Sequence, residues 1–332
     1  MPTPIRKVVI SEFGDYSKVK IVNDTLPDPP AGHVQIKILY AGFAGPDIAM
    51  RCGVYPFQKK APFTPGYSAA GIVQANGPNC KRFQTGELVV CLSVYEAEAT
   101  LANFPEKYLI PVPPGIDATQ ATPLVLDWSS AYGIVHRSAH VQQGQRVFIH
   151  GMSGAVGRAL LTLCQLAGAE VYGTASERNH VALRKLGATP FVYTDKNWIT
   201  EMKALGGADA VFDPLGFESF DESYSILSKH GVLVGYGGNL PTLNGQPPRT
   251  QIWPAIKLLL RNLMLGSGKK TRFFYISRDQ STFVPELETL FRMVREGKIT
   301  VPIKRVFSLD EVPIAHRDWT KLTGMGSVLV KM

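Results

Sequence analysis

Cysteine is scarce in this sequence of 332 residues, and the arrangement of the four that occur excludes several classes of protein. None belongs to a C-x-x-C pair, so neither a disulfide framework nor a cysteine-rich zinc site is expected. The chain shows no secretory signal pattern, and together with the unpaired thiols this favours a reducing, cytoplasmic location. A G-x-S-x-G turn is also missing, which excludes an α/β-type serine hydrolase. The cysteines are Cys52, Cys80, Cys91 and Cys164.

Long apolar runs are missing as well, and none reaches the roughly 18 to 20 residues that a membrane span needs. The nearest candidate, Ile252 to Leu265, is interrupted by Lys257 and Arg261, which would share one face of a helix. Such a segment can contact a membrane surface. Packing against its own domain or at a dimer interface is the favoured interpretation.

Acidic residues are too few to balance the basic ones. There are 35 Lys and Arg residues against 27 Asp and Glu, which gives a net charge of +8. The basic residues are scattered, and this pattern favours an anionic cofactor and a solvated surface over nucleic acid. Only Lys269 to Tyr275 combines basic and aromatic residues closely, so nucleic-acid binding is not expected and would have to involve that segment.

The most informative segment that is present runs from Arg146 to Gly157 and reads RVFIHGMSGAVG. An apolar strand leads into a glycine-rich turn, and a helical pattern follows. A diphosphate-binding turn needs residues without a Cβ where the backbone approaches the anion, and it directs the N–H groups of the following helix at the phosphates. Gly151, Gly154 and Gly157 meet these needs, with Met152 where the commoner G-x-G-x-x-G motif has a glycine. The alternative is a βα turn without a ligand.

The residues after the next expected strand, Glu170 to Ala175, indicate which nucleotide is bound. Folds that bind NAD usually have an acidic residue there for the ribose 2′-hydroxyl, whereas this chain continues with Ser176, Glu177 and Arg178. A hydroxyl and a guanidinium suit a 2′-phosphate, although Glu177 repels one unless its side chain points away. NADPH is therefore favoured over NADH.

Hydrophobic periodicity predicts two domains, in agreement with a chain long enough to bury a large core. A β-rich start and a mixed tail (residues 1–123 and 267–332) are expected to form one domain around a central α/β domain (residues 124–266). Strands and helices alternate in the centre, which predicts a doubly wound parallel sheet. The expected strands are Lys7–Ile10, Val34–Tyr40, Ala69–Gln74, Leu88–Leu92, Val147–His150, Val171–Thr174, Ala210–Asp213, Val232–Gly235 and Ser327–Lys331. The expected helices are Asn179–Leu186, Asp195–Leu205, Phe220–Leu227, Val284–Glu296 and Leu309–Leu322.

Several short motifs are spread along the chain, namely Arg51–Tyr55, Thr64–Ser68, Gly86–Val89, Ser130–Tyr132, His150–Gly157, Gly173–Ser176, Asp213–Gly216 and Gly235–Gly237. With these motifs the chain resembles the medium-chain dehydrogenase/reductase superfamily over nearly its whole length, and most closely its zinc-free quinone oxidoreductase branch, which includes zeta-crystallin and the vesicle amine transport protein homologues. This resemblance implies a GroES-like β-rich domain and a Rossmann domain.

The resemblance also implies that no metal is bound. Zinc-dependent relatives have Cys or His ligands in three segments, which here read Ala41–Asp47, Gly66–Ser68 and Leu126–Trp128 and contain neither residue type. Without a Lewis acid, alcohol oxidation is disfavoured, whereas hydride transfer from NADPH to a quinone or to the C=C bond of an α,β-unsaturated carbonyl remains feasible.

The resemblance assigns Tyr55, Tyr67 and Asp127 as candidate catalytic residues. Tyr55 is the first choice for substrate or cofactor contact and proton donation, with a packing role at a domain boundary as the alternative. Tyr67 occupies the position of a zinc-binding histidine. Ala44 replaces a usual asparagine, and Asp127 with Trp128 replaces Asn-Tyr, so a bulkier or more specialised enone from a biosynthetic pathway is a second candidate substrate.

The same resemblance assigns residues that bind the cofactor. Ser130 matches a position near the nicotinamide phosphate, Ser176 and Arg178 face the 2′-phosphate, and Tyr193 stacks beside it or packs in the core. The diphosphate turn comprises Ser153, Gly154, Ala155, Val156 and Gly157, and the nicotinamide side comprises Gly237, Asn239, Phe274 and Tyr275. A homodimer is expected from the family, and an NADPH-binding protein without turnover is the alternative from another functional class.

Overall fold

The computed structural model describes residues 2–263 and 266–332 and divides them into two compact units. The first consists of residues up to Ser129, Ser277–Thr323 and Ser327–Met332, and the second of Ser130–Ile276 with Gly324–Gly326. Each unit has its own sheet and its own buried core.

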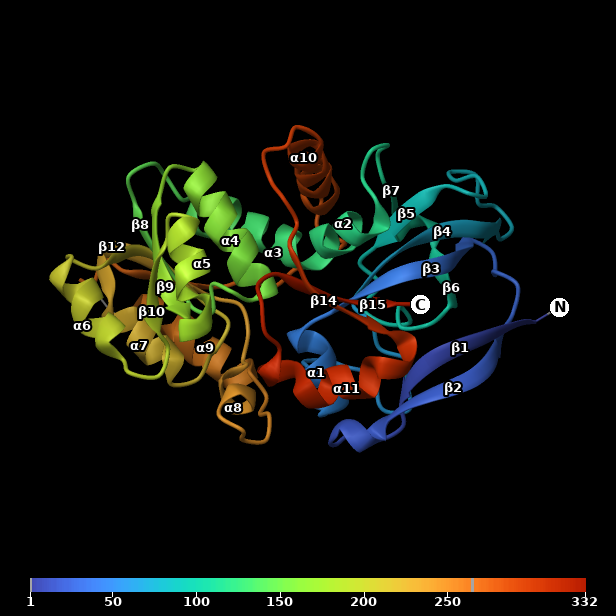
Figure 1. The fold of residues 1–332 in the computed structure, drawn as a ribbon, viewed down its shortest axis with the longest axis horizontal. Coiled ribbons are helices and arrows are strands. Elements are labelled where there is room, and N and C mark those ends of the chain that lie inside the picture. The colour runs from blue at the N-terminus through green and yellow to red at the C-terminus, as the bar shows by residue number, and fades with distance from the viewer. Residues whose placement is uncertain (1, 264–265) are drawn as a thin grey trace. The chain divides into compact units, whose positions relative to one another are not determined.

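The first unit is built around a largely antiparallel β-sheet, in which only β14 and β15 pair in parallel among the described strands (Figure 1). Its seven-stranded sheet has the order β14-β15-β3-β4-β5-β7, with β6 also paired to β3, and a separate hairpin joins β1 to β2. The strands are β1 (Thr3–Ile10), β2 (Val19–Leu26), β3 (His33–Phe43), β4 (Ser68–Asn76), β5 (Leu88–Cys91), β6 (Leu101–Pro105), β7 (Leu109–Pro111), β14 (Ile303–Ser308) and β15 (Ser327–Lys331). The helices are α1 (Gly45–Arg51), α2 (Ala118–Pro123), α10 (Phe283–Arg295) and α11 (Val312–Asp318), with a π-helical segment η3 (Leu124–Trp128) and short 3₁₀ turns that include η7 (Leu309–Glu311) and η8 (Trp319–Lys321).

The second unit is a six-stranded parallel sheet with helices packed on it (Figure 1). Its order, β10-β9-β8-β11-β12-β13, is that of a Rossmann fold, and the order reverses between β8 and β11. The strands are β8 (Arg146–Ile149), β9 (Glu170–Ala175), β10 (Thr189–Val192), β11 (Ala208–Asp213), β12 (Leu227–Gly235) and β13 (Lys270–Phe273). The helical segments are α3 (Ser129–Tyr132), η4 (Gly133–Ala139), α4 (Ala155–Leu166), η5 (Glu177–Asn179), α5 (His180–Lys185), α6 (Asn197–Ala204), α7 (Ser219–Ser225), α8 (Leu240–Leu243), α9 (Ile252–Leu260) and η6 (Arg261–Leu263).

The predicted fold class, a GroES-like β-rich domain with a Rossmann parallel-sheet domain, is confirmed. The structure divides the chain at Ser129/Ser130 and Ile276/Ser277, whereas the sequence placed the divisions after residues 123 and 266. The later second division follows from β13, which pairs with β12 and so joins the Rossmann sheet. Its sequence, KTRF, is short and half basic, and therefore gives no clear strand signal.

Two expected helices differ from the observed ones. The helix expected over Phe220–Leu227 ends at Ser225, because Leu227 already begins β12 and pairs with Ala208. The helix expected over Leu309–Leu322 is broken into η7, α11 and η8. A serine cap with Glu311 forms a separate first turn before Val312, which explains why the pattern did not form one continuous helix.

The apolar segment Ile252–Leu265 forms α9 and η6 in the second unit, and its last two residues lie outside the described part of the chain. Leu258 is buried, and the basic side chains Lys257 and Arg261 both pair with Asp221 of α7. The helix thus packs on its own domain, while Trp253 on another face remains 66% exposed. Among the described residues no helix is long and apolar enough to cross a bilayer.

Candidate active site

The glycine turn after β8 has the geometry of a backbone-built anion site. Gly151 adopts a positive φ of 70°, and Gly154 caps α4 without a side-chain hydrogen bond, so no side chain occupies the start of the helix. A Cβ on Gly157 would lie 2.1 Å from the carbonyl oxygen of Gly151, which makes this position intolerant of any side chain. The first N–H groups of α4 are therefore available for an anion.

Hydrogen bonds to the neighbouring strand β9 hold this turn in place. The Gly151 N–H donates to Thr174 Oγ1 at 3.2 Å, and the Met152 N–H donates to the Thr174 carbonyl at 2.9 Å. His150, completely buried at the end of β8, contacts Thr174 Oγ1 through Nδ1 and Ser223 Oγ through Nε2. Burial lowers the pKa of His150, so its ring is neutral at physiological pH.

Asp213 extends this buried network to the end of β11. Its Oδ1 accepts the N–H groups of Leu215 and Gly216, and its Oδ2 accepts the hydroxyls of Ser219 and Ser223, each at 2.7 Å. Four donors satisfy a carboxylate that is fully buried. Because β8 and β11 flank the point where the strand order reverses, the network stiffens the sheet edge at which Rossmann folds bind nucleotides. The sequence analysis did not assign His150 or Asp213 to the site.

The residues predicted to recognise the 2′-phosphate lie at the ends of β9 and β10. Ser176 is half-buried, whereas Glu177 and Arg178 are exposed in η5. Asn179 is buried and donates its N–H to the Ser176 carbonyl at 2.9 Å. Tyr193 directly follows β10 and is 52% exposed, so it is not a core residue.

The residues predicted for the nicotinamide side come from three further segments of the second unit. Gly237 and Asn239 follow β12, and the Asn239 N–H donates to the Pro214 carbonyl at 3.1 Å. Phe274 is buried against the backbone of Gly133, where a Cβ would lie 2.6 Å from the ring. Tyr275 is 55% exposed, and Ser130 in α3 is 7% exposed.

In the first unit the structure brings together the two tyrosines that the sequence assigned to catalysis. The phenol oxygens of Tyr55 and Tyr67 are 2.7 Å apart, and their rings meet edge to face with centroids 5.9 Å apart. Tyr67 is 1% exposed, whereas Tyr55 is half-buried. Gln58 fixes the Tyr55 segment, because its Oε1 accepts the Tyr55 N–H at 2.8 Å and its Nε2 donates to the Met50 carbonyl.

Asp127 lies on η3 and is 7% exposed. Its Oδ2 accepts a hydrogen bond of 2.6 Å from the Ser327 hydroxyl at the start of β15. Burial raises the pKa of Asp127 to about 6, and the Ser327 hydrogen bond only partly offsets this. Near neutral pH the group is therefore poised to gain or lose a proton.

Two other carboxyl groups in the first unit, Asp47 and Glu98, are completely buried, and the sequence analysis assigned a role to neither. Burial raises the pKa of Asp47 to about 7 and that of Glu98 well above its ordinary value. The sequence signal that could have revealed them is the occurrence of acidic residues among apolar neighbours at strand and helix ends, a weak pattern by itself.

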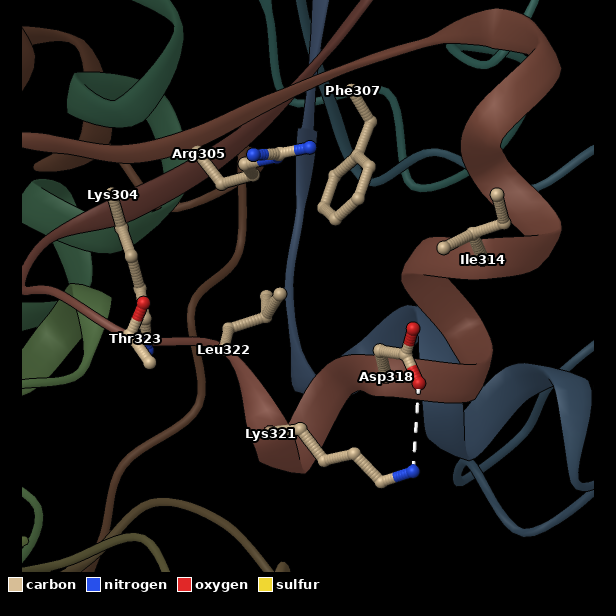
Figure 2. Close-up of a pocket in the computed structure, with 8 residues that line it drawn as sticks. All are labelled: Lys304, Arg305, Phe307, Ile314, Asp318, Lys321, Leu322 and Thr323. Atoms are coloured by element: carbon tan, nitrogen blue, oxygen red, sulfur yellow. Dashed lines mark ion pairs between the residues drawn. The ribbon is translucent and has the colours of Figure 1, made fainter.

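A cavity of about 380 Å³ opens in the first unit beside β14 and α11. Lys321 and Asp318, which both line it, form an ion pair of 3.6 Å, and Figure 2 shows this pair together with the apolar lining residues Phe307, Ile314 and Leu322. None of the residues predicted for the site lines this cavity, so it is separate from the tyrosine pair. Within residues 2–263 and 266–332, no cluster of three or more His, Cys, Asp or Glu side chains is arranged to hold a metal ion.

Comparison with known families gives two matches on the chain. Residues 30–114 match the alcohol dehydrogenase GroES-like domain, and residues 186–330 match the zinc-binding dehydrogenase family. Among individual proteins, the chain is 27% identical to the rat (Rattus norvegicus) synaptic vesicle membrane protein VAT-1 homolog, over 98% of this chain and 84% of the relative. It is 25% identical to a probable quinone oxidoreductase of Schizosaccharomyces pombe, over 93% of this chain and 92% of the relative.

Solved structures share the fold along the whole chain. The CurK enoyl reductase superposes with a TM-score of 0.84 at 23% identity, covering 99% of both chains. A mycobacterial protein complexed with NADPH superposes with a TM-score of 0.84 at 24% identity, covering 99% of this chain and 100% of the other. At such identities the likeness concerns the fold.

Proposed function

Because the chain belongs to the medium-chain dehydrogenase/reductase superfamily, in the branch of the quinone oxidoreductases and VAT-1 homologues, we propose that it is an NADPH-dependent, zinc-independent reductase. Its proposed substrates are quinones or the C=C bond of α,β-unsaturated carbonyl compounds. The observation that carries this proposal is the 2.7 Å hydrogen bond between the phenols of Tyr55 and Tyr67. A paired phenol can supply a proton where zinc-dependent relatives use a metal ligand.

The glycine turn fits a dinucleotide. The helix start at Gly154 carries no competing side-chain cap, and Gly157 leaves no Cβ in the turn. In this proposal Ser153–Gly157 bind the diphosphate, and Ser176 with Arg178 binds the 2′-phosphate beside Tyr193. The nicotinamide side is formed by Ser130, Gly237, Asn239, Phe274 and Tyr275. When bound, NADPH supplies a hydride to an electron-poor carbon of the substrate.

The tyrosine pair supplies the proton that completes the reduction. Tyr55 is the more exposed phenol, so it gives its proton to the enolate or hydroquinone oxygen. The buried Tyr67 then donates its own O–H to the Tyr55 oxygen and stabilises the phenolate as it forms. For an enone, hydride at the β carbon and the proton at the enolate oxygen give an enol, which tautomerises to the saturated carbonyl compound. For a quinone, one hydride and one proton supply the two electrons and two protons that give the hydroquinone, and solvent then returns a proton to the tyrosine pair.

A specialised enone is the second candidate substrate, and it is favoured by the polar groups around the proposed site. Ala44 lacks the amide that related proteins have, and Asp127 with Trp128 replaces Asn-Tyr. An enoyl reductase, CurK, shares the fold over 99% of this chain. A homodimer through the edge strand β13 of the Rossmann sheet is also proposed, because β13 is paired on one side only in the described sheet.

The test is to titrate the purified protein with NADPH and NADH, and then to follow absorbance at 340 nm with quinones and with linear and cyclic enones in the presence of a chelator. NADPH-selective turnover that survives chelation supports a zinc-independent reductase and ranks the two substrate classes. Tight NADPH binding without turnover of any of these substrates supports a non-catalytic NADPH-binding protein. Failure to bind either nucleotide refutes the proposal.

A further inference from the structure

Asp47 and Glu98 form a pair of buried carboxyl groups that the proposed chemistry does not use. Both side chains are 0% exposed. Asp47 Oδ2 accepts the Ala44 N–H at 2.8 Å, whereas Asp47 Oδ1 and both oxygens of Glu98 have no hydrogen-bond partner among the described residues. Two buried charges so poorly compensated would be very unfavourable, so the pair must hold a proton.

Glu98 is the group that keeps the proton, whereas the pKa of Asp47 is raised to about 7, so Asp47 is the one that ionises near neutral pH. The Ala44 N–H donates to Asp47 Oδ2, and the backbone N–H groups of Asp47 and Gly66 also lower the pKa of this carboxyl group. Glu98 receives no such donor, and the charge of Asp47 further disfavours its ionisation. The carboxyl groups that act on Asp47 are thus Glu98 and Asp127, and the latter raises its pKa.

Asp47 connects the segments that carry the two tyrosines. It lies in the first turn of α1, and the end of that helix continues through Cys52 and Gly53 to Tyr55, with the Val54 N–H bonded to the Ala49 carbonyl at 3.1 Å. The N–H of Gly66, the residue directly before Tyr67, lowers the pKa of the same carboxyl group. One carboxyl group, that of Asp47, therefore interacts with both segments that carry the tyrosines.

The loop that ends at Glu98 holds the Tyr67 segment along its length. The N–H groups of Val94, Glu96 and Glu98 donate to the carbonyls of Tyr67, Thr64 and Pro65, each at 3.1 Å. The Ser93 hydroxyl donates to the Gly66 carbonyl at 2.9 Å. Gly66 has a φ of 111°, and a Cβ there would lie 2.6 Å from the Glu98 nitrogen. The Tyr67 segment therefore cannot shift without displacing Glu98.

We propose that Asp47 and Glu98 are positioning residues that set the Tyr55–Tyr67 hydrogen bond, Asp47 through the backbone N–H groups of Ala44 and Gly66, and Glu98 as its neutral, proton-bearing neighbour. This inference rests on the proposed function, since it assigns the pair to the same proton-donating site. Neither residue touches substrate or cofactor in this proposal.

The test compares Asp47→Asn with Glu98→Gln in the full-length protein. Asp47→Asn removes the charge and is expected to lower kcat about 10-fold, with KM for NADPH unchanged within twofold, because the nucleotide residues lie in the other unit. Glu98→Gln keeps a neutral group of the same shape and is expected to retain kcat within about twofold. Asp117→Asn is the matched control, because it removes the carboxylate cap of α2 in the same unit without contacting either tyrosine segment.

A second readout needs no turnover. The tyrosines are labelled with ¹³C at Cζ, and the resonances of Tyr55 and Tyr67 are assigned with the variants Tyr55→Phe and Tyr67→Phe. NMR spectra are then recorded from pH 5 to 9. The protein carries Asp127→Asn, because this change removes the other carboxyl group that acts on Asp47. The two phenol resonances are expected to shift together somewhat below pH 7, because Asp127 no longer raises the pKa of Asp47, and to keep this transition in Glu98→Gln. Adding Asp47→Asn should abolish it.

The outcomes separate the two proposals. If the wild-type protein reduces no quinone or enone, the proposed function fails, while the NMR experiment still decides the positioning role. Absence of any shared tyrosine transition in the Asp127→Asn background overturns the inference even if Asp47→Asn does not fold. Unchanged kcat and unchanged tyrosine resonances in a folded Asp47→Asn variant overturn it as well. A large loss of kcat in Glu98→Gln would show that Glu98 is not neutral and would refute the assigned proton.

Discussion

The nucleotide turn and the tyrosine pair are built in opposite ways. The turn lies within residues 146–157 and offers its backbone N–H groups to the ligand. Its side chains matter mainly at Gly157, where the close backbone approach leaves no room for a Cβ. The tyrosine pair is made of two side chains, and the segment that carries Tyr67 is held by backbone hydrogen bonds from Val94, Glu96 and Glu98. The first is fixed by local conformation, and the second by tertiary contacts.

This difference teaches where each site is vulnerable. A backbone site tolerates changes of side chain except where a glycine is required. A side-chain site depends on buried polar groups, which lose stability when one partner is removed or changes its charge. The following predictions test that contrast, beginning with the largest expected effect.

Gly157→Ala should lower NADPH affinity by up to about 100-fold, equivalent to the roughly 3 kcal/mol at the upper end for overpacking. The new Cβ would lie 2.1 Å from the Gly151 carbonyl oxygen, so the turn must open. Fluorescence titration with NADPH measures the dissociation constant, and circular dichroism confirms that the variant is folded.

Gly154→Ala is the matched control. Here a Cβ would meet only the Gly151 carbonyl oxygen, at 3.3 Å, and the φ of −71° suits alanine. Affinity should change by no more than about threefold. Equal losses in the two variants would show that the turn is not fixed by the close approach at Gly157.

The same contrast explains which parts of the molecule could be predicted from sequence. The strand Ser327–Lys331 and the turn at Gly151–Gly157 were predicted within a residue of the structure, because alternation and glycine spacing are local signals. The short strands β13 and β14 were not predicted, since their sequences, KTRF and IKRVFS, carry basic residues and gain stability only by pairing with β12 and β15.

In the candidate site, too, features fixed by local sequence could be predicted, whereas features fixed by tertiary contacts could not. Tyr55 and Tyr67 were assigned only through a family resemblance, and nothing in their spacing implied a hydrogen bond between them. Asp47 and Glu98 could not be found, because what distinguishes them is complete burial with carboxyl oxygens that lack a hydrogen-bond partner among the described residues, a property of the folded chain. The roles of all these residues stay predictions until the kinetic tests are made.

The ionised Asp127 carboxylate lowers the stability of the folded protein, and the variant Asp127→Asn should reveal this loss. Burial raises the pKa of Asp127 from an unfolded value of about 3.9 to about 6. A raised pKa means that the folded state favours the neutral acid, so stability is full below about pH 4 and is lost as pH rises through 6. Asparagine does not ionise and can still accept from Ser327, so the variant should exceed the wild type at pH 8 by up to about 3 kcal/mol and match it near pH 4.

Urea unfolding at several pH values gives this difference directly. Subtracting variant from wild type at each pH cancels the other titrating groups. A difference that does not change with pH would show that Asp127 has the same charge in the folded and unfolded states.

The tyrosine pair should behave as one unit in kinetics. If Tyr55 and Tyr67 act through their 2.7 Å hydrogen bond, the effects of Tyr55→Phe and Tyr67→Phe on kcat should not add. The coupling energy from the double-mutant cycle should be about 1 to 2 kcal/mol, because removing either hydroxyl breaks the same bond. Measuring kcat of both single variants and the double variant with one substrate is sufficient, and additive effects would refute a shared role.

The smallest effect is expected at the 2′-phosphate end of the nucleotide site, the one place where that site depends on an exposed side-chain charge. Arg178 and Glu177 are adjacent and exposed in η5, with opposite charges. Arg178→Ala should weaken NADPH binding about fivefold while leaving NADH binding unchanged, since solvent screens an exposed charge and limits its contribution to about 1 kcal/mol.

Glu177→Ala should strengthen NADPH binding by a factor of about two, because it removes the repulsion between the Glu177 carboxylate and the 2′-phosphate. Paired titrations with both nucleotides at low and high salt decide the matter, since an electrostatic preference must shrink as salt rises. If both variants bind NADPH as the wild type does, the preference resides in Ser176 and Tyr193 instead, and this end of the site would also be built without charge.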